Sequence, residues 1–147
     1  MKKPSSVDKL SYRTVADNEM LYLIQTSREG LDYEIFRKIA LQNHFSMNDW
    51  SGLLHISERT LQRYRKEKRK FNQAQSERIL EIVLLMNHGL EVFGGADKFN
   101  SWLISENLAL GRIKPKQLLD SSFGIGIIKD ELTRIEHGIL HENLPPV

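Results

Sequence analysis

The sequence predicts an all-α protein in which a helix-turn-helix region packs with a C-terminal helical domain. Apolar residues recur at helical spacing through most of the 147 residues. Short polar residues that can cap a helix N-terminus precede several of these stretches, and glycine or proline follows them. The chain contains no cysteine, which excludes a disulfide framework and a thiolate metal site.

The N-terminal part of the chain predicts a tail followed by one clear helix. Residues 1–16 are polar and carry scattered charges, so we expect a flexible tail. The apolar patch from Met20 to Ile24 fits a strand or part of a helix, and Gly30 ends it. From Leu31 to Asn43 the apolar spacing predicts a helix with one buried side.

Two short helices joined by a tight turn are predicted next, within a helix-turn-helix region over residues 17–72. Ser46 and Asp49 form a variant of the capping box at the first helix, the turn is His55-Ile56, and Ser57 caps the second helix. The residues expected to face the core are Trp50, Leu53, Leu54, Leu61 and Tyr64.

Residues 73–147 are predicted to form a second helical region that ends in a C-terminal tail. Asn72 and Gln75 make another capping box before a long helix over 73–93, which Gly94-Gly95 ends. A helix over 96–105 and a loop over 106–114 follow. Pro115 suits the first turn of a short helix. The last helix begins at Ser121 or Ser122 and is expected to end at Gly138.

Positive charge is concentrated in the second helix of the helix-turn-helix. Between Glu58 and Lys70 the chain has seven Lys or Arg and two Glu, a net charge of +5, whereas the whole chain carries +2, which leaves −3 for the rest. The seven basic residues are Arg59, Arg63, Arg65, Lys66, Lys68, Arg69 and Lys70. A basic helix of this kind is typical of a helix that enters the DNA major groove, although a solvated charged face gives the same pattern.

If this helix docks in the DNA major groove, its residues are predicted to contact either the bases or the phosphates. Glu58, Arg59 and Gln62 point away from Leu61 and could reach base edges. Ser57 and Thr60 suit phosphate contacts at the helix N-terminus, and Arg63, Arg65 and Lys66 would add phosphate pairing.

The second half of the chain carries a set of motifs in a fixed order. They are Phe93-Gly94, Trp102-Leu103, Asn107 with Leu110-Gly111, Pro115 with Leu118-Leu119, Gly124, Ile128, Leu132, and Arg134-Ile135-Glu136 with Gly138. In this order and spacing the segment from Val92 to Ile139 resembles the toxin-binding domain of the Xre/ParS/MbcA-type antitoxins, which pair with RES-domain toxins.

The resemblance implies a type II antitoxin that covers the active-site cleft of a RES-domain toxin consuming NAD or transferring ADP-ribose. It also implies that residues 73–147 form a helical dimerisation and toxin-binding domain with a C-terminal tail. The implied homo-dimer binds an inverted-repeat operator and represses its own operon. The polar loop and the chain end are the candidate contacts. The residues expected to bind the toxin are Asn107, Arg112, Lys116, Arg134, Glu136, His141 and Glu142.

Enzymatic motifs are missing from the sequence, so we expect no enzyme and no cofactor. Gly124 and Gly126 lack the third glycine of a dinucleotide fingerprint. His137 and His141 are four residues apart, but the expected helix end at Gly138 separates them and no third ligand is near, so no metal site is expected. The remaining histidines are interpreted as surface or helix-end residues: His44, His55 and His88.

The chain has no apolar run long enough for a membrane span and no apolar segment at its start that would suit a secretory signal, so we expect a cytoplasmic protein with no membrane partner. Two other functions stay open on the residues alone. One is a stand-alone helix-turn-helix transcription regulator without a toxin partner. The other is a protein-interaction module whose basic helix does not bind DNA.

Overall fold

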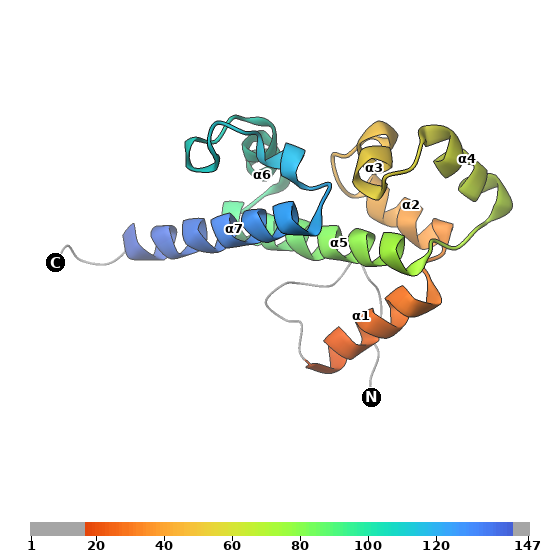
Figure 1. Ribbon diagram of the computed structural model, residues 1–147. Coiled ribbons are helices and arrows are strands. Elements are labelled where there is room, and N and C mark those ends of the chain that lie inside the picture. The colour runs from red at the N-terminus through yellow and green to blue at the C-terminus, as the bar shows by residue number, and fades with distance from the viewer. Residues whose placement is uncertain (1–16, 143–147) are drawn as a thin grey trace. The chain divides into compact units, whose positions relative to one another are not determined.

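The computed structural model describes residues 17–142 as an all-α fold, which confirms the predicted fold class (Figure 1). The described helices are α1 (Asp17–Glu29), α2 (Tyr33–Leu41), α3 (Met47–Leu54), α4 (Glu58–Glu67), α5 (Gln73–Phe93), α6 (Ala96–Ile104), the short 3-10 helices η2 (Leu108–Leu110) and η3 (Pro115–Leu118), and α7 (Ser122–Glu142). The tail predicted over residues 1–16 lies outside the described residues.

The described residues form two compact units, one up to Asn87 and one from His88 onward. The division falls within α5. The domain boundary predicted from the sequence, between residues 72 and 73, lies at the beginning of this helix and stays a prediction.

An aromatic cluster forms the centre of the first unit. The ring of Phe36 packs edge-on against Trp50 and Phe71, with ring centroids 5.1 and 5.0 Å apart. Tyr64 of α4 joins the cluster through Phe71, at 5.4 Å. The five residues predicted to face the core from α3 and α4 are all buried, so the orientation of both helices is confirmed.

The connection between α1 and α2 is tied to the start of α5. Gly30 has φ +89°, and a Cβ atom there would lie 2.4 Å from the carbonyl oxygen of Phe71, so only glycine fits without a shift. The next residue, Leu31, donates its N–H to Ser76 Oγ at 2.9 Å and accepts a bond from the Phe71 N–H at 2.9 Å. Gly30 ends α1 as predicted, and the Met20–Ile24 patch is helical.

Close backbone approaches allow the second unit to pack tightly. A Cβ atom on Gly89 of α5 would lie 2.1 Å from the ring of Phe99 in α6. A Cβ atom on Gly124 of α7 would lie 1.7 Å from the carbonyl oxygen of Leu118 in η3. The apolar core residues of this unit are Phe99, Leu103, Leu119, Ile125, Ile128 and Leu132.

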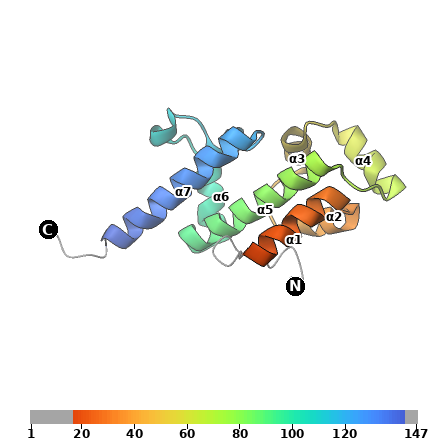
Figure 2. The same ribbon diagram turned by 60° about the horizontal axis from the view of Figure 1, so that its bottom comes forward.

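The predicted end of the last helix at Gly138 is wrong, because α7 continues to Glu142. One glycine in a helix interior costs only about 1 kcal/mol relative to alanine, which neighbouring hydrogen bonds can outweigh. The chain meets no proline until Pro145. Figures 1 and 2 show that the C-terminal turns of α7 extend beyond the rest of the second unit.

None of the described helices is by itself long and apolar enough to cross a membrane. The helices α5 and α6 meet such a criterion only as a pair, across a bend of 110°.

Candidate functional site

Local hydrogen bonds set the start of α3 and the turn that follows it. Ser46 Oγ accepts a bond from the Asp49 N–H at 3.0 Å, and an Asp49 carboxylate oxygen accepts from the Ser46 N–H at 2.9 Å, which confirms the predicted capping box. His55 ends the helix in the left-handed region, with φ +57°, and the N–H of Ile56 reaches back to the Ser51 carbonyl at 3.1 Å. This turn directs the chain into α4.

Ser57 and Thr60 are engaged with each other at the start of α4. Ser57 Oγ accepts a bond from the Thr60 N–H and donates to Thr60 Oγ1, both at 3.0 Å. Ser57 is therefore the N-cap that the sequence predicts. The Ser57 hydroxyl can bond a phosphate only if it gives up or shares its bond to Thr60 Oγ1. The other backbone N–H groups of the first turn lie at the positive end of the helix dipole, where they suit a phosphate.

The face of α4 opposite the core is exposed and polar. Leu61 and Tyr64 are buried. The predicted base-reading residues Glu58, Arg59 and Gln62 are all exposed. An open hollow of about 360 Å³ lies among the side chains of Arg59, Thr60, Gln62, Arg63 and Lys66. The structure thus brings five of the eight predicted DNA-contacting residues together at this hollow. Arg65 instead lines a second hollow, with Tyr33 and Arg37 of α2.

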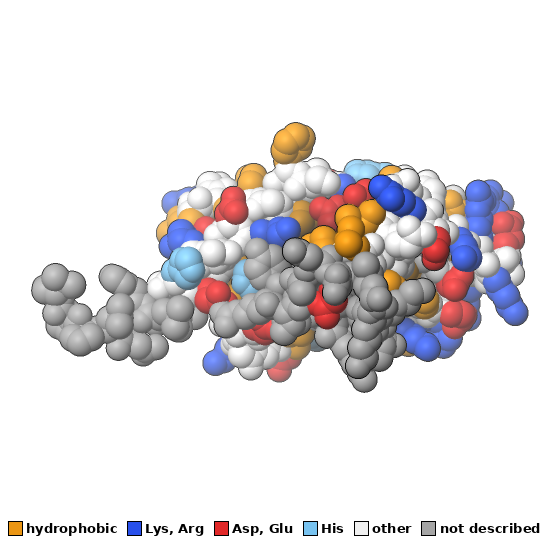
Figure 3. All heavy atoms as spheres, turned by 90° about the horizontal axis from the view of Figure 1, so that it is seen from below, with side chains coloured by type: hydrophobic (Ala, Val, Ile, Leu, Met, Phe, Trp, Pro, Cys, Tyr) orange, Lys and Arg blue, Asp and Glu red, His pale blue; other side chains and the backbone are white. Residues whose placement is uncertain are grey.

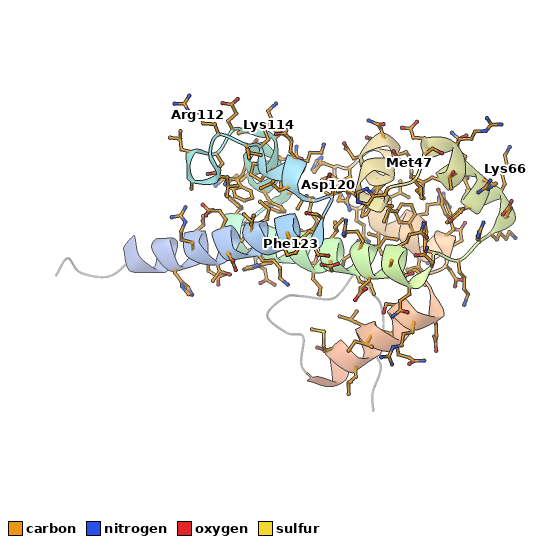
Figure 4. The ribbon with its side chains drawn as sticks, in the orientation of Figure 1. Met47, Lys66, Arg112, Lys114, Asp120 and Phe123 are labelled. Atoms are coloured by element: carbon orange, nitrogen blue, oxygen red, sulfur yellow. The ribbon has the colours of Figure 1, made fainter. Side chains whose placement is uncertain are left out.

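Cationic side chains continue past the end of α4. Arg65 and Lys66 are exposed in its last turn, and Figure 4 shows Lys66 pointing outward. Lys and Arg side chains gather at this end of the first unit in Figure 3. The guanidinium carbon of Arg69 lies 4.8 Å from the centre of the Tyr64 ring, a cation–π contact that sequence reasoning missed. This contact holds Arg69 beside α4.

Arg78 of α5 joins the long helix to the end of α3. Its Nη1 donates a bond of 3.1 Å to the carbonyl oxygen of Leu53, and Arg78 Nε lies 3.9 Å from Glu81 Oε1. A cation at a helix C-terminus is favourable because the last carbonyls carry partial negative charge. The two partners are 25 residues apart, and no local sequence pattern indicates the contact.

Asn107 organises the loop between α6 and η3. Its side-chain oxygen accepts a bond from the Ala109 N–H at 2.8 Å. Its backbone N–H donates to Ile113 at 3.1 Å, and its carbonyl accepts from the Arg112 N–H at 2.8 Å. Asn107 is half-buried. The structure therefore gives this predicted toxin contact a clear role in shaping the loop.

The other two predicted contacts near this loop differ in accessibility. Arg112 is exposed and adopts φ +67°, and its side chain points away from the unit in Figure 4. Lys116 lies in η3 and is half-buried.

The predicted contacts on α7 lie on its C-terminal half. The Arg134 Nε donates to Glu131 Oε2 at 3.0 Å, and its Nη2 makes a second, short bond to the other carboxylate oxygen. The hydrogen bonds that Arg134 donates to Glu131, together with the negative charge of that carboxylate, raise the pKa of the Arg134 guanidinium above its ordinary value. His141 and Glu142 belong to the last turn of α7.

Glu136 faces α5 more than it faces solvent. Its Oε2 lies 3.8 Å from Nε2 of His88, and the side chain of Glu136 is 19% exposed. The interpretation of His88 as a surface or helix-end residue is wrong, since its side chain is only 1% exposed. No local pattern indicates this burial, because the contact partner, Glu136, lies far along the sequence in α7.

The predicted toxin-binding residues thus form two sets, one in and beside the loop over residues 106–114 and one on the C-terminal half of α7. No group of three His, Cys, Asp or Glu residues that could hold a metal ion occurs within the part of the chain that the structure describes.

A helix-turn-helix whose second helix, α4, is basic and exposed, followed by a second helical unit, is the architecture of a two-domain DNA-binding regulator. Residues 23–84 match the antitoxin Xre-like helix-turn-helix domain, and residues 88–138 match the antitoxin Xre/MbcA/ParS C-terminal toxin-binding domain. The chain belongs to the Xre family of antitoxins.

Two curated relatives cover most of the chain. An antitoxin Xre of Photorhabdus laumondii subsp. laumondii is 33% identical over 113 residues, 76% of each chain. An antitoxin Xre of Yersinia enterocolitica is 27% identical over 118 residues, 80% of each chain. With the two matched domains, these relatives support a DNA-binding antitoxin that neutralises a toxin.

Proposed function

We propose that this chain is the antitoxin of a type II pair whose toxin has a RES domain and consumes NAD or transfers ADP-ribose. The matched toxin-binding domain supports a toxin partner. The resemblance of the segment from Val92 to Ile139 to antitoxins that pair with RES-domain toxins supports the kind of toxin. The toxin carries the chemistry, and this chain acts by covering its active-site cleft.

The C-terminal half of α7 suits this blocking role. Its last turns extend beyond the rest of the second unit, so they can enter a recess on a partner (Figure 1). Arg134 keeps part of its guanidinium free for a partner, because Glu131 accepts bonds only from Nε and Nη2. The active-site cleft of an enzyme that acts on NAD contains charged groups. Where one of these groups is a carboxylate, the ordered guanidinium of Arg134 can pair with it.

The first unit is proposed to bind operator DNA as a homo-dimer and to repress the operon that encodes it. Arg59 can bond a guanine through two donors, Gln62 can bond an adenine, and Glu58 can accept from a cytosine. Two copies related by a two-fold axis place two reading helices about one DNA turn apart, which predicts an inverted-repeat operator.

The observation that carries the DNA part of this proposal is the exposed row of residues on α4. Glu58, Arg59 and Gln62 are accessible on the side of the helix opposite Leu61 and Tyr64. This row supports the proposal, because Glu, Arg and Gln side chains can each bond a base edge in the major groove.

Co-expression with the neighbouring gene product, followed by co-purification and measurement of the complex mass, tests the toxin part. The chain shortened after Glu136 keeps the His88–Glu136 contact but lacks the end of α7. We expect it to retain operator binding and to lose growth protection against the toxin. Continued protection by the shortened chain would contradict the blocking role, and failure of the intact chain to bind the toxin would refute the proposed partner.

A further inference from the structure

The loop between α6 and η3, which we call the 106–114 loop, has a fixed shape. Its chain reverses through two successive residues in the left-handed region, Gly111 at φ +73° and Arg112 at φ +67°. The Gly111 N–H donates to the Leu108 carbonyl at 3.1 Å, and Asn107 pairs with Ile113 across the loop. A loop held by its own backbone bonds loses little conformational entropy when a partner binds.

This loop exposes apolar side chains that the second unit does not use. Leu108 is 79% exposed, and Ile104 and Ile113 on either side of it are also exposed. The core of the unit is complete without them, since Leu103, Leu119 and Ile128 are fully buried. A single exposed leucine is ordinary, but three aliphatic side chains from one short segment mark a contact surface.

Two cations stand beside these apolar side chains. Arg112 and Lys114 are exposed, and Figure 4 shows both projecting from the loop. The loop's acidic residue is Glu106, so residues 106–114 carry two positive charges and one negative charge. Residues 88–147 as a whole have six Lys or Arg and eight Asp or Glu, a net charge of −2. The positive loop therefore differs in sign from the unit that carries it, which favours an acidic partner surface at this place.

We infer that the 106–114 loop anchors the toxin: Leu108 enters an apolar recess on the toxin, and carboxylates on the rim of that recess face Arg112 and Lys114. This inference rests on the proposed function, because it assigns a second contact to the same partner. It adds to the α7 surface an apolar anchor outside the blocking end of the chain. The partner is identified by its chemistry, an apolar socket with an acidic edge.

Leu108→Asp tests the apolar anchor, and Phe123→Asp is the matched control. Phe123 is 90% exposed at the start of α7 in the same unit, and Figure 4 shows it apart from the loop. Affinity for the purified toxin is measured by titration calorimetry, and the fold is checked by circular dichroism and by operator binding. We expect Leu108→Asp to weaken toxin binding about tenfold or more, as loss of a buried leucine does, and Phe123→Asp to change it less than about threefold.

Reversal of charge tests the acidic rim. Arg112→Glu combined with Lys114→Glu is expected to weaken binding and to reduce its dependence on salt. Lys98→Glu, an exposed position in the first turn of α6, serves as the control and is expected to have little effect.

Several outcomes would overturn the inference. Equal toxin binding by the wild type and Leu108→Asp would exclude the anchor while leaving the proposed function intact. Equal losses in Leu108→Asp and Phe123→Asp would show a dependence on exposed apolar area in general. If Leu108→Asp changed the oligomeric mass of the free antitoxin without changing its affinity for the toxin, the loop would be assigned to self-association. Absence of toxin binding by the wild-type chain would refute the proposed function itself, and this inference with it.

Discussion

Glu131 holds the guanidinium of Arg134 through both carboxylate oxygens. The two residues are one turn apart on α7, and their exposures differ sharply: the side chain of Glu131 is 9% exposed and that of Arg134 is 65% exposed. A nearly buried carboxylate thus fixes the direction of an accessible cation. We therefore expect Glu131 to position Arg134 for the toxin contact proposed above.

Glu131→Gln is expected to weaken toxin binding because the amide cannot hold the guanidinium in the same charged fork. If Glu131 acts through Arg134, the double variant Glu131→Gln/Arg134→Ala should bind no more weakly than Arg134→Ala alone. Surface plasmon resonance measures the four affinities. Asp130→Asn, which removes an exposed charge from the neighbouring position, is the control. Additive losses in the double variant would argue against positioning.

Arg59→Ala combined with Gln62→Ala is expected to remove sequence preference from DNA binding. Each lost base contact should cost about 1–3 kcal/mol of discrimination between operator and unrelated DNA. Lys66→Ala, in contrast, should weaken both kinds of DNA alike and lower the salt slope by about 1. Competition binding at several salt concentrations separates the two effects. An unchanged ratio of operator to unrelated affinity in the double variant would show that other residues read the bases.

Two glycines of α7 should respond in opposite directions to alanine. Gly124→Ala places a Cβ atom 1.7 Å from the Leu118 carbonyl oxygen, and we expect a loss of about 2 kcal/mol or more in the free energy of unfolding. Gly126→Ala meets no atom within 4 Å and should gain roughly 0.5–1 kcal/mol from helix propensity. Urea unfolding of both variants is the measurement. Destabilisation by Gly126→Ala would contradict the open space beside this helix face.

Arg78→Met is expected to lower the free energy of unfolding by about 1–3 kcal/mol. The substitution keeps much of the apolar stem but leaves the Leu53 carbonyl without the donor it has at 3.1 Å. Arg37→Met is the control, because its pair with Glu34 is exposed on both sides and such pairs contribute about 1 kcal/mol or less. Similar losses of unfolding free energy in the two variants would show that the bond from Arg78 to Leu53 stabilises the fold no more than an exposed ion pair does.

The phenol of Tyr33 is expected to make the free energy of unfolding fall as the pH becomes alkaline. Burial raises the pKa of Tyr33 above its ordinary value of 10.0, although Arg65 and Arg37 oppose the shift. The Tyr33 phenol therefore keeps its proton in the folded state at a pH where it loses that proton in the unfolded state. The corresponding stability is present below about pH 10 and is lost as the pH rises through the folded-state pKa. Tyr33→Phe should lose less stability than the wild type between pH 9 and pH 11 in urea titrations. Equal losses would place the titrating group elsewhere.

Features set by neighbouring residues were predictable from the sequence. The capping boxes at Ser46–Asp49 and Asn72–Gln75 depend on side chains three residues apart, and both form as expected. The bounds of α5 also match the prediction, because an apolar stripe with a cap before it and two glycines after it defines a helix locally.

Features set by distant residues were not predictable. The bond from Arg78 to Leu53 and the burial of His88 depend on how helices pack, and packing leaves no local signature. The end of α7 was misplaced because one glycine is only a weak helix breaker. The assignment of DNA-contacting and toxin-contacting residues stays a prediction.

The contact between Gly89 and Phe99 constrains how this family can vary. A methyl group at position 89 would occupy space that the Phe99 ring fills, since the ring lies 2.1 Å from the Cβ position. Natural relatives that carry alanine at the first site should therefore carry a smaller side chain at the second. The two positions should change as a pair over evolutionary time, and a laboratory library randomised at both should recover the compensated combinations rather than either change alone.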